Sequence, residues 1–292
     1  MAVMDDASLL AAYDEQLRAD AEMGSTADVV RHGPLLWGRF HSGRGFVSYQ
    51  TLGTPTDAEL EQLIVETIEH YEADAEVTEF EWKTRGHDGV PALDGLLRKH
   101  RFVPEDVESV MIGEATAIAA DVPVPEGVSL RSITSREDVT AMVRMQAGVF
   151  GDPETIDERV DSTLRRLHDT DAPGVELWIA EAGGRPISAG RIDPVPNTDF
   201  AGIWGGATVP EWRGRGIYRA LTAKRAQAAL RAGKTLINSD STEFSRPILE
   251  RSGFRRVTTT TPYICSAERF ELTANSSTSP ARCGAADDCT SF

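Results

Sequence analysis

The pattern of apolar and polar positions divides the chain into two stretches of similar outline. From Val128 onward, short apolar or alternating runs, typical of strands, interleave with segments in which apolar residues recur every three to four positions, typical of amphipathic helices. The order β-α-α-β-β-β-α-β-α-β-β predicts a mixed α/β sheet with helices on its faces. The predicted strands are 128–133, 176–182, 186–193, 201–209, 235–238, 255–260 and 263–266, and the predicted helices are 136–150, 153–168, 217–233 and 246–252.

The first 120 residues follow a comparable pattern. Periodicity predicts helices at 7–23, 57–73 and 92–100, and strands at 35–40, 45–50, 79–83 and 108–114. Two pieces far apart in the chain, LLRKHRFVPEDVESVMIG and ILERSGFRRVTTTTPYIC, look alike. In each, a short helix turns through a basic residue and a Phe into a strand, which we interpret as a degenerate internal repeat.

A linker-like segment separates the two stretches. Residues 114–127, EATAIAADVPVPEG, contain two prolines, small residues and acids, which are typical of a strand end followed by a connection. We therefore expect one domain at 1–122 and a second at 123–273. Residues 274–292 hold Cys283 and Cys289 but almost no large apolar side chain, so a disordered tail is predicted there.

Composition narrows the class of protein. The 292 residues are 40% apolar, which is enough for a real core, and no run approaches the roughly 20 apolar residues needed to cross a bilayer. The acidic first residues lack the basic leader of a signal peptide, so a cytoplasmic protein without a membrane partner is expected. No CxxC pair or nearby Cys and His group suggests a metal site, and no metal is predicted.

The net charge of −16 is unevenly distributed. Residues 1–127 carry 25 Asp and Glu against 9 Lys and Arg, whereas residues 128–292 carry 21 of each. The acidity of the first stretch argues against nucleic acid as a partner. It suits a cationic partner or simple solubility. Residues 213–256, in contrast, hold 11 Lys and Arg against 3 acids, which favours a polyanionic ligand over a plain solvated face.

The basic region begins with a distinctive turn, VPEWRGRGIYRALTAKRAQAAL, from Val209 to Leu230. The first N–H groups of a helix have no internal partner and can bind a pyrophosphate if no side chain blocks them. Gly214 and Gly216 remove that obstacle, and Arg213 and Arg215 add positive charge. A basic loop without a ligand explains the four residues alone about as well.

Residues 128–270 resemble the GNAT superfamily of N-acetyltransferases. The phosphate-binding motif of that family, Gln/Arg-x-x-Gly-x-Gly/Ala, is matched by Arg213-Gly214-Arg215-Gly216-Ile217-Tyr218, except that the sixth residue is Tyr. A short helix that ends in Gly-Phe, SRPILERSGF, is a second shared feature. The first stretch is similar to the degenerate partner domain of tandem GNAT proteins. The resemblance implies a largely antiparallel mixed sheet in two tandem domains.

The resemblance also implies a coenzyme and its contacts. Acetyl-CoA would be the acyl donor, and residues 213–218 would bind its diphosphate. In the family, a bulge moves the preceding strand away from its neighbour, and the pantetheine arm pairs with the freed backbone. By position this backbone belongs to Ala207, Thr208 and Val209, and Gly205-Gly206 suits a bulge. A kink without a ligand is the alternative explanation of the two glycines.

The catalytic groups are less well indicated. The family often uses a Tyr four residues before the Gly of Gly-Phe as general acid, and here that residue is Leu249. Ser245, at the start of the same helix, is a candidate proton donor, although a helix-capping role is the favoured explanation. Asp240 is a candidate base, or else a solvated carboxylate in a turn. Tyr218 is expected to form a wall beside the ligand.

These inferences predict an N-acetyltransferase that transfers acetyl from acetyl-CoA directly to a primary amine of a small molecule or peptide. A non-catalytic module that binds acyl-CoA is the alternative, because Leu249 cannot donate a proton. The acidic first domain is expected to border the acceptor site.

Overall fold

One continuous sheet runs through the molecule. The computed structural model describes residues 4–24, 26–151, 155–170 and 173–266. Within them, twelve strands form a sheet in the order β1-β2-β3-β4-β12-β6-β11-β10-β9-β8-β7, and β5 pairs with β12. Two of the pairs, β3 with β4 and β10 with β11, are parallel, and the other pairs are antiparallel. The predicted mixed, largely antiparallel sheet is confirmed.

The elements have the following bounds. The strands are β1 Thr26–His32, β2 Leu35–Phe40, β3 Gly45–Tyr49, β4 Glu79–Arg85, β5 Val103–Pro104, β6 Glu108–Glu114, β7 Val128–Ile133, β8 Glu176–Ala182, β9 Arg185–Pro194, β10 Phe200–Thr208, β11 Leu236–Ser241 and β12 Arg255–Ser266. The helices are α1 Asp6–Gln16, η1 Ala19–Met23, α2 Asp57–Glu72, α3 Ala92–Lys99, α4 Ala115–Ile118, α5 Arg136–Phe150, α6 Ile156–Leu167, η2 Pro210–Trp212, α7 Ile217–Arg231 and α8 Arg246–Glu250.

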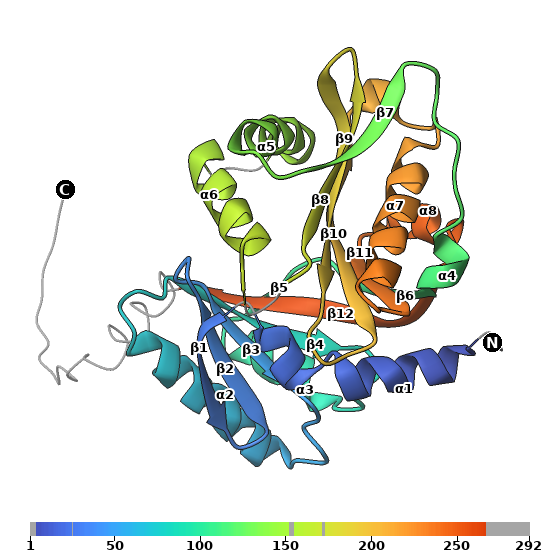
Figure 1. Cartoon of the computed structure of the whole chain (residues 1–292). Helices are drawn as coiled ribbons and strands as arrows, with labels where there is room; N and C mark the ends of the chain where they lie inside the picture. The colour runs from blue at the N-terminus through green and yellow to red at the C-terminus, as the bar shows by residue number, and fades with distance from the viewer. Residues whose placement is uncertain (1–3, 25, 152–154, 171–172, 267–292) are drawn as a thin grey trace, which may run out of the picture.

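Helices cover both faces of the strands in the upper half of the molecule, as Figure 1 shows. There α5 and α6 lie on one side of β8–β10, while α7, α8 and α4 lie on the other. The apolar residues of α5 and α6 pack on β8 and β9, and the alanines of α7 pack on β9–β11. A separate aromatic core, which includes Trp37, Tyr71, Phe80 and Trp82, fills the space between α2, α3 and the strands of the lower half.

The two stretches of the chain share strands. The last strand of the first stretch, β6, lies between β11 and β12, and both of these strands belong to the second stretch. The final strand, β12, pairs with β4 of the first stretch. In Figure 1, β12 runs across the boundary between the upper and lower halves. The aligned backbones of β6 and β12 therefore join the two halves into one body.

The similar pieces at the ends of the two stretches have matching geometry. Phe102 and Phe254 are both buried, and each donates its N–H to a leucine carbonyl five residues earlier, Leu97 and Leu249, at 3.0 and 3.1 Å. The residue before each Phe has a positive φ, 67° at Arg101 and 99° at Gly253. A left-handed residue thus ends both short helices, as the repeat interpretation expects.

Several predicted bounds are wrong. The helix expected at 7–23 ends at Gln16 and is followed by the 3-10 helix η1, and the strands expected at 255–260 and 263–266 form one strand. Part of the expected linker forms α4, and β1 was not predicted at all. The expected start of the second helix, at residue 153, lies outside the described residues. In the structure Thr155 caps α6, accepting the N–H of Glu158.

Candidate functional site

The strand β10 contains a bulge and then separates from β11. Its pairing with β9 shifts by one residue between Trp204 and Ala207, which places the bulge at Gly205 and Gly206. Its pairing with β11 ends at Gly202 opposite Asn238, although β10 continues to Thr208. One edge of the second half of β10 is therefore not paired with β11. The side-chain amide of Gln146 donates to the carbonyl of Gly205 at 2.7 Å and fixes the bulge.

The glycine-rich turn places an open helix start beside this edge. Gly216 is the N-cap of α7, at φ 79°, and no side chain caps the helix. Gly214 has φ 75°, and no atom lies within 4 Å of a Cβ built at either glycine. Arg213 is held by a hydrogen bond from its Nε to the carbonyl of Thr208, at 3.0 Å. The guanidinium of Arg215 lies 4.8 Å from the ring centroid of Trp212.

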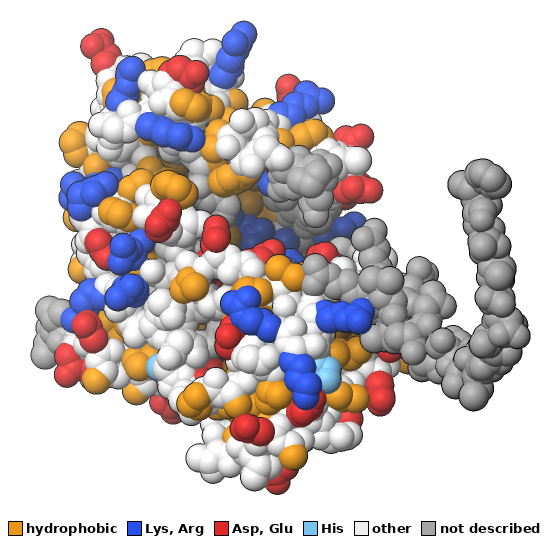
Figure 2. Space-filling view, turned by 180° about the vertical axis from the view of Figure 1, so that it is seen from behind, with side chains coloured by type: hydrophobic (Ala, Val, Ile, Leu, Met, Phe, Trp, Pro, Cys, Tyr) orange, Lys and Arg blue, Asp and Glu red, His pale blue; other side chains and the backbone are white. Residues whose placement is uncertain are grey.

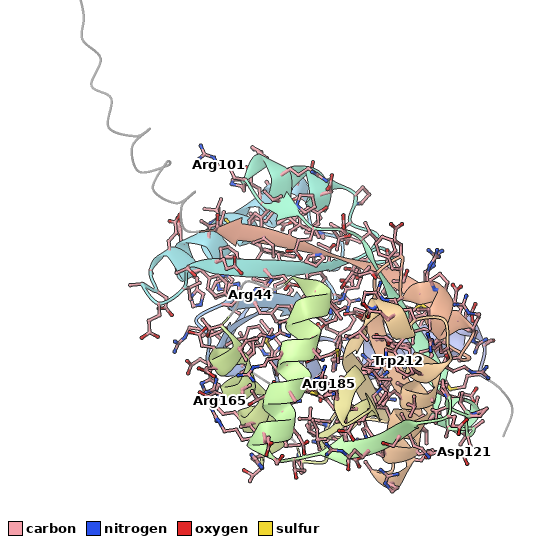
Figure 3. All side chains as sticks on the ribbon, turned by 90° about the horizontal axis from the view of Figure 1, so that it is seen from above. Arg44, Arg101, Asp121, Arg165, Arg185 and Trp212 are labelled. Carbon is pink, nitrogen blue, oxygen red and sulfur yellow. The ribbon has the colours of Figure 1, made fainter. Side chains whose placement is uncertain are left out.

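This turn has the properties of an anion site. The first N–H groups of α7 have no partner within the helix, and its dipole makes them partly positive. Arg213, Gly214, Arg215 and Gly216 are all exposed. In Figure 3, Trp212 lies on the α7 side of the central strands and Arg165 on the α6 side. The turn therefore opens on the opposite side of the sheet from α6.

The three residues predicted to contact the pantetheine arm, Ala207, Thr208 and Val209, differ in whether their backbone groups are free to bind a ligand. Val209 donates its N–H to the carbonyl of Ile187 at 3.0 Å, so that group is already used within the sheet. The Ala207 carbonyl accepts from the Ser188 hydroxyl at 2.7 Å. Because neighbouring residues of an antiparallel strand direct their backbone groups to opposite sides, the N–H of Thr208 faces the edge away from β9. Thr208 is thus the residue best placed to pair with a ligand.

A large cavity lies on the other face of the sheet. Its volume is about 1350 Å³, and both halves of the molecule line it, with Glu22, Lys83, Arg166, Trp204, Asn238 and Asp240 among its walls. Figure 2 shows a hollow between the two halves, with basic side chains inside it and acidic ones along its lower rim. Trp204 and Asn238 lie where β10 and β11 separate. The cavity therefore extends to the gap between these two strands, beside which the glycine-rich turn also lies.

A buried charge cluster forms one wall of this cavity. The ammonium of Lys83 lies 2.7 Å from Asp240 and 3.2 Å from Glu22. Burial would lower the pKa of Lys83, but the Asp240 and Glu22 carboxylates outweigh it and raise this pKa. Burial would raise the pKa of Glu22, but Arg85 and Lys83 together lower it to about 2. Asp240 is therefore ion-paired, not a solvated carboxylate in a turn.

A second carboxyl near the cluster has the opposite shift. Burial, and next the charge of Asp240, raise the pKa of Glu108 to about 7. Glu108 begins β6 and is half-buried. The main causes of this shift, burial and the charge of Asp240 on β11, depend on the fold and cannot be read from the residues around Glu108.

Ser245 and Leu249 lie on the α7 side of the sheet. Ser245 is the N-cap residue of α8, but its hydroxyl makes no capping bond and lies 3.3 Å from both the carbonyl and the hydroxyl oxygen of Thr242. Leu249 is fully buried in the core cluster that also contains Ile203 and Phe254. Tyr218 packs against that cluster, and its ring touches the bulge at Gly206.

Asn238 is a site residue that sequence reasoning missed. It is 7% exposed and lines the cavity, and its Oδ1 is buried without a hydrogen-bond partner. A buried amide oxygen without a partner is costly unless a ligand satisfies it. Gln146 was missed as well, because only the fold brings α5 to the bulge.

The described ranges contain neither a metal-binding cluster nor a membrane-spanning helix. Residues 4–24, 26–151, 155–170 and 173–266 contain no cluster of three or more His, Cys, Asp or Glu side chains arranged to hold a metal ion. No helix within those ranges has the length and apolar character needed to span a bilayer.

Comparisons with known proteins agree with this geometry. Residues 141–254 match the model of the acetyltransferase (GNAT) family. A GCN5-related N-acetyltransferase from Kribbella flavida is similar in structure, with a TM-score of 0.62 at 16% identity over 88% of this chain and 93% of that one. A tandem GNAT protein from the clavulanic acid biosynthesis pathway gives 0.59 at 14% identity, over 82% of each chain. No curated protein matches the chain. At these identities the neighbours establish the fold.

Proposed function

We propose that the protein transfers acetyl from acetyl-CoA to a primary amine of a small molecule or peptide, because residues 141–254 match the model of the acetyltransferase (GNAT) family. The observation that carries this proposal is the coincidence of two features. An uncapped helix start bared at Gly214 and Gly216 lies beside a strand whose edge is free beyond Gly202. The first feature suits a diphosphate, and the second suits an extended amide arm.

The residues of the chain fit that coenzyme. Arg213, Gly214, Arg215, Gly216, Ile217 and Tyr218 would hold the diphosphate through backbone N–H groups and guanidinium charge. Thr208 and Ala207 would border the pantetheine arm, while Val209 would contribute only its side chain, because its N–H is used by Ile187. The coenzyme supplies an activated acyl group, and the backbone at the bulge would polarise its carbonyl.

The acceptor amine would approach from the cavity. The free Oδ1 of Asn238 can accept a hydrogen bond from an amine N–H at the point where β10 and β11 separate. Asp240, two residues along β11, is the proposed base, with Lys83 holding its carboxylate in place. Ser245, on the other face, is a candidate proton donor to the departing sulfur. No metal is required for these steps.

The division of the chain belongs to the same proposal. We propose that residues 1–122 form a GNAT-like domain without a phosphate turn and that residues 123–273 form the coenzyme-binding domain. Glu22 and Lys83 of the first domain line the cavity, so this domain would contribute a wall of the acceptor site.

Thiol release tests the activity. Acetyl-CoA, a panel of primary amines and the full chain are mixed, free thiol is followed with a chromogenic disulfide, and acetylated product is identified by mass. Amine-dependent release is expected, with a large reduction in Asn238→Ala. The absence of release with every amine, in a folded protein that binds acetyl-CoA in calorimetry, would contradict the enzyme and support the non-catalytic module instead.

A further inference from the structure

A buried arginine lies beneath the bulge without a carboxylate partner. Arg225 of α7 has no exposed surface, and no described carboxylate forms an ion pair with it. Its Nη2 donates to the Thr222 hydroxyl at 3.0 Å, its Nε approaches the Leu221 carbonyl at 3.4 Å, and its Nη1 has no partner. Burying a charge without a counter-charge is expensive, so its retention calls for a role.

The surrounding backbone is shaped around this guanidinium. A Cβ built on Gly190 of β9 would lie 2.5 Å from Nη1 of Arg225, so the guanidinium lies against the backbone of β9 in the space that glycine leaves free. Gly190 lies between Ala189 and Arg191, which pair with the residues on either side of the bulge, Ala207 and Trp204. The positive charge therefore lies directly under the bulge.

The aromatic ring above this charge belongs to Tyr218. The guanidinium carbon of Arg225 is 5.5 Å from the ring centroid of Tyr218. The hydroxyl of Tyr218 would lie 2.7 Å from a Cβ at Gly206, which places it over the bulge. Within the described parts of the chain this hydroxyl makes no hydrogen bond. Tyr218 also packs against the core cluster that contains the buried Leu249.

We propose that Tyr218 is the catalytic proton donor to the departing thiolate and that Arg225 is the positioning residue that stabilises the phenolate left behind. This inference rests on the proposed function. A bond forms between the amine nitrogen and the acyl carbon, the carbon–sulfur bond breaks, and the sulfur takes the proton of the Tyr218 hydroxyl. Asp240, the proposed base, takes the proton lost by the amine nitrogen and passes it through water to the phenolate, so the enzyme ends unchanged. The guanidinium of Arg225, which lies over the ring of Tyr218, would stabilise the negative charge of the phenolate as that charge develops in the transition state.

The first test compares three Tyr or Ser variants by acetyl-CoA thiol release with the amine panel. Y218F keeps the ring and removes the hydroxyl, and we expect kcat to fall about 100-fold with little change in KM for acetyl-CoA. Y263F is the matched control, since the Tyr263 hydroxyl is bonded to Asp94 in the aromatic core, and S245A tests the competing donor. Full activity in Y218F, or a 100-fold loss in S245A instead, would overturn the assignment.

The second test separates charge from packing. R225K retains a cation and R225M does not. We expect the descending limb of the pH–rate profile to move to higher pH in R225M and to stay near its original position in R225K. Equal impairment of both variants with unchanged profiles would show that Arg225 only packs.

A third measurement does not require turnover. The tyrosinate absorbance of Tyr218 is obtained as the wild-type minus Y218F difference during pH titration, with and without CoA. The proposal predicts that CoA shifts the midpoint and that R225M shifts it further. A midpoint insensitive to CoA would refute the proposal even if no amine is acetylated, and a CoA-sensitive midpoint without turnover would count against the proposed function alone.

Discussion

Two β–α–β units with the same topology begin their helices differently. The unit β3–α2–β4 and the unit β10–α7–β11 each join two parallel strands through one helix. In the first, Thr56 and Glu59 form a capping box that satisfies the N–H groups at the start of α2. In the second, Gly216 caps α7 with no side chain, and its N–H groups stay open. The fold is thus shared, and the chemistry of the cap decides which unit can receive an anion.

The strands that precede the two helices also differ, in how far each continues beyond its pairing with the next parallel strand. β3 pairs with β4 over three of its five residues, the last of them Val47, and ends only two residues later at Tyr49, which is buried in the core. β10 pairs with β11 over three of nine residues and continues beside a gap. A closed helix start follows a filled core in the first unit, and an open helix start follows a free strand edge in the second.

Loss of the buried link between the two halves is expected to have the largest effect. K83M would leave the Asp240 carboxylate buried without its cation and would leave Glu22 with Arg85 alone, so we expect the free energy of unfolding to fall by about 3–5 kcal/mol. Denaturant unfolding at pH 7 measures it. The control K99M removes a surface pair with Glu61 and should cost less than about 1 kcal/mol. Equal losses in both variants would show that the cluster does not join the halves.

Filling the open turn is expected to weaken coenzyme binding about 100-fold, which is roughly 2.7 kcal/mol. Calorimetry with CoA on G214V/G216V measures this effect. The matched control is G53V, because Gly53 lies before α2, has φ 67° and also has no atom within 4 Å of a built Cβ. It suffers similar backbone strain without facing the ligand. Comparable affinity loss in G53V would trace the effect to strain.

The pH dependence of stability follows from two carboxyls with opposite pKa shifts, Glu22 in the charge cluster and Glu108 near it. The folded pKa of Glu22 is about 2, below its ordinary 4.5, so its contribution is present above pH 4.5 and disappears as the pH falls toward 2. The folded pKa of Glu108 is about 7, above its ordinary 4.5, because the folded protein favours the protonated carboxyl. The contribution of Glu108 to the free energy of unfolding is therefore fully present below pH 4.5 and is lost as the pH rises through 7. E108Q should therefore be more stable than wild type at pH 8, by roughly 1–2 kcal/mol after allowing for its partial exposure.

Thermal unfolding at pH 4.5 and pH 8 checks this prediction. The gain of E108Q should disappear at pH 4.5, and D106N, a change at an exposed neighbour, should show no pH-dependent gain. A gain that is the same at both pH values would show that Glu108 is not a buried acid.

Removal of the α2 cap is expected to have the smallest effect. T56A deletes the side chain that accepts the N–H of Glu59, and it should cost about 1 kcal/mol without changing CoA affinity. S135A, at the cap of α5, should cost a similar amount. A change in CoA affinity in T56A would break the comparison between a structural and a ligand-binding helix start.

Local features were predictable from the sequence, whereas their partners were not. The period of α2 and the glycine turn before α7 are visible in a few adjacent residues, and both elements occur where expected. The edge strand β1 was missed because its side chains are mostly exposed and show no alternation. The insertion of β6 between β11 and β12 depends on pairing across more than 100 residues. The same is true of Lys83 beside Asp240 and of Gln146 at the bulge.

Catalytic assignments were hardest for the same reason. Ser245 and Asp240 were chosen by position in the chain, but the surroundings that determine their chemistry, Thr242 for one and Lys83 for the other, appear only in the fold. In the sequence, nothing separates Arg225 from the other basic residues of 213–256. Only its burial beneath the bulge, which depends on the fold, distinguishes it.

The most direct test of the central claim compares CoA with pantetheine, which has the same arm but no diphosphate. Calorimetric titration of the full chain at low salt gives both affinities. If the open start of α7 binds the diphosphate, CoA should bind at least 100-fold more tightly than pantetheine, and most of that difference should disappear in G214V/G216V. Equal affinities for the two ligands in the wild-type protein would contradict the assignment.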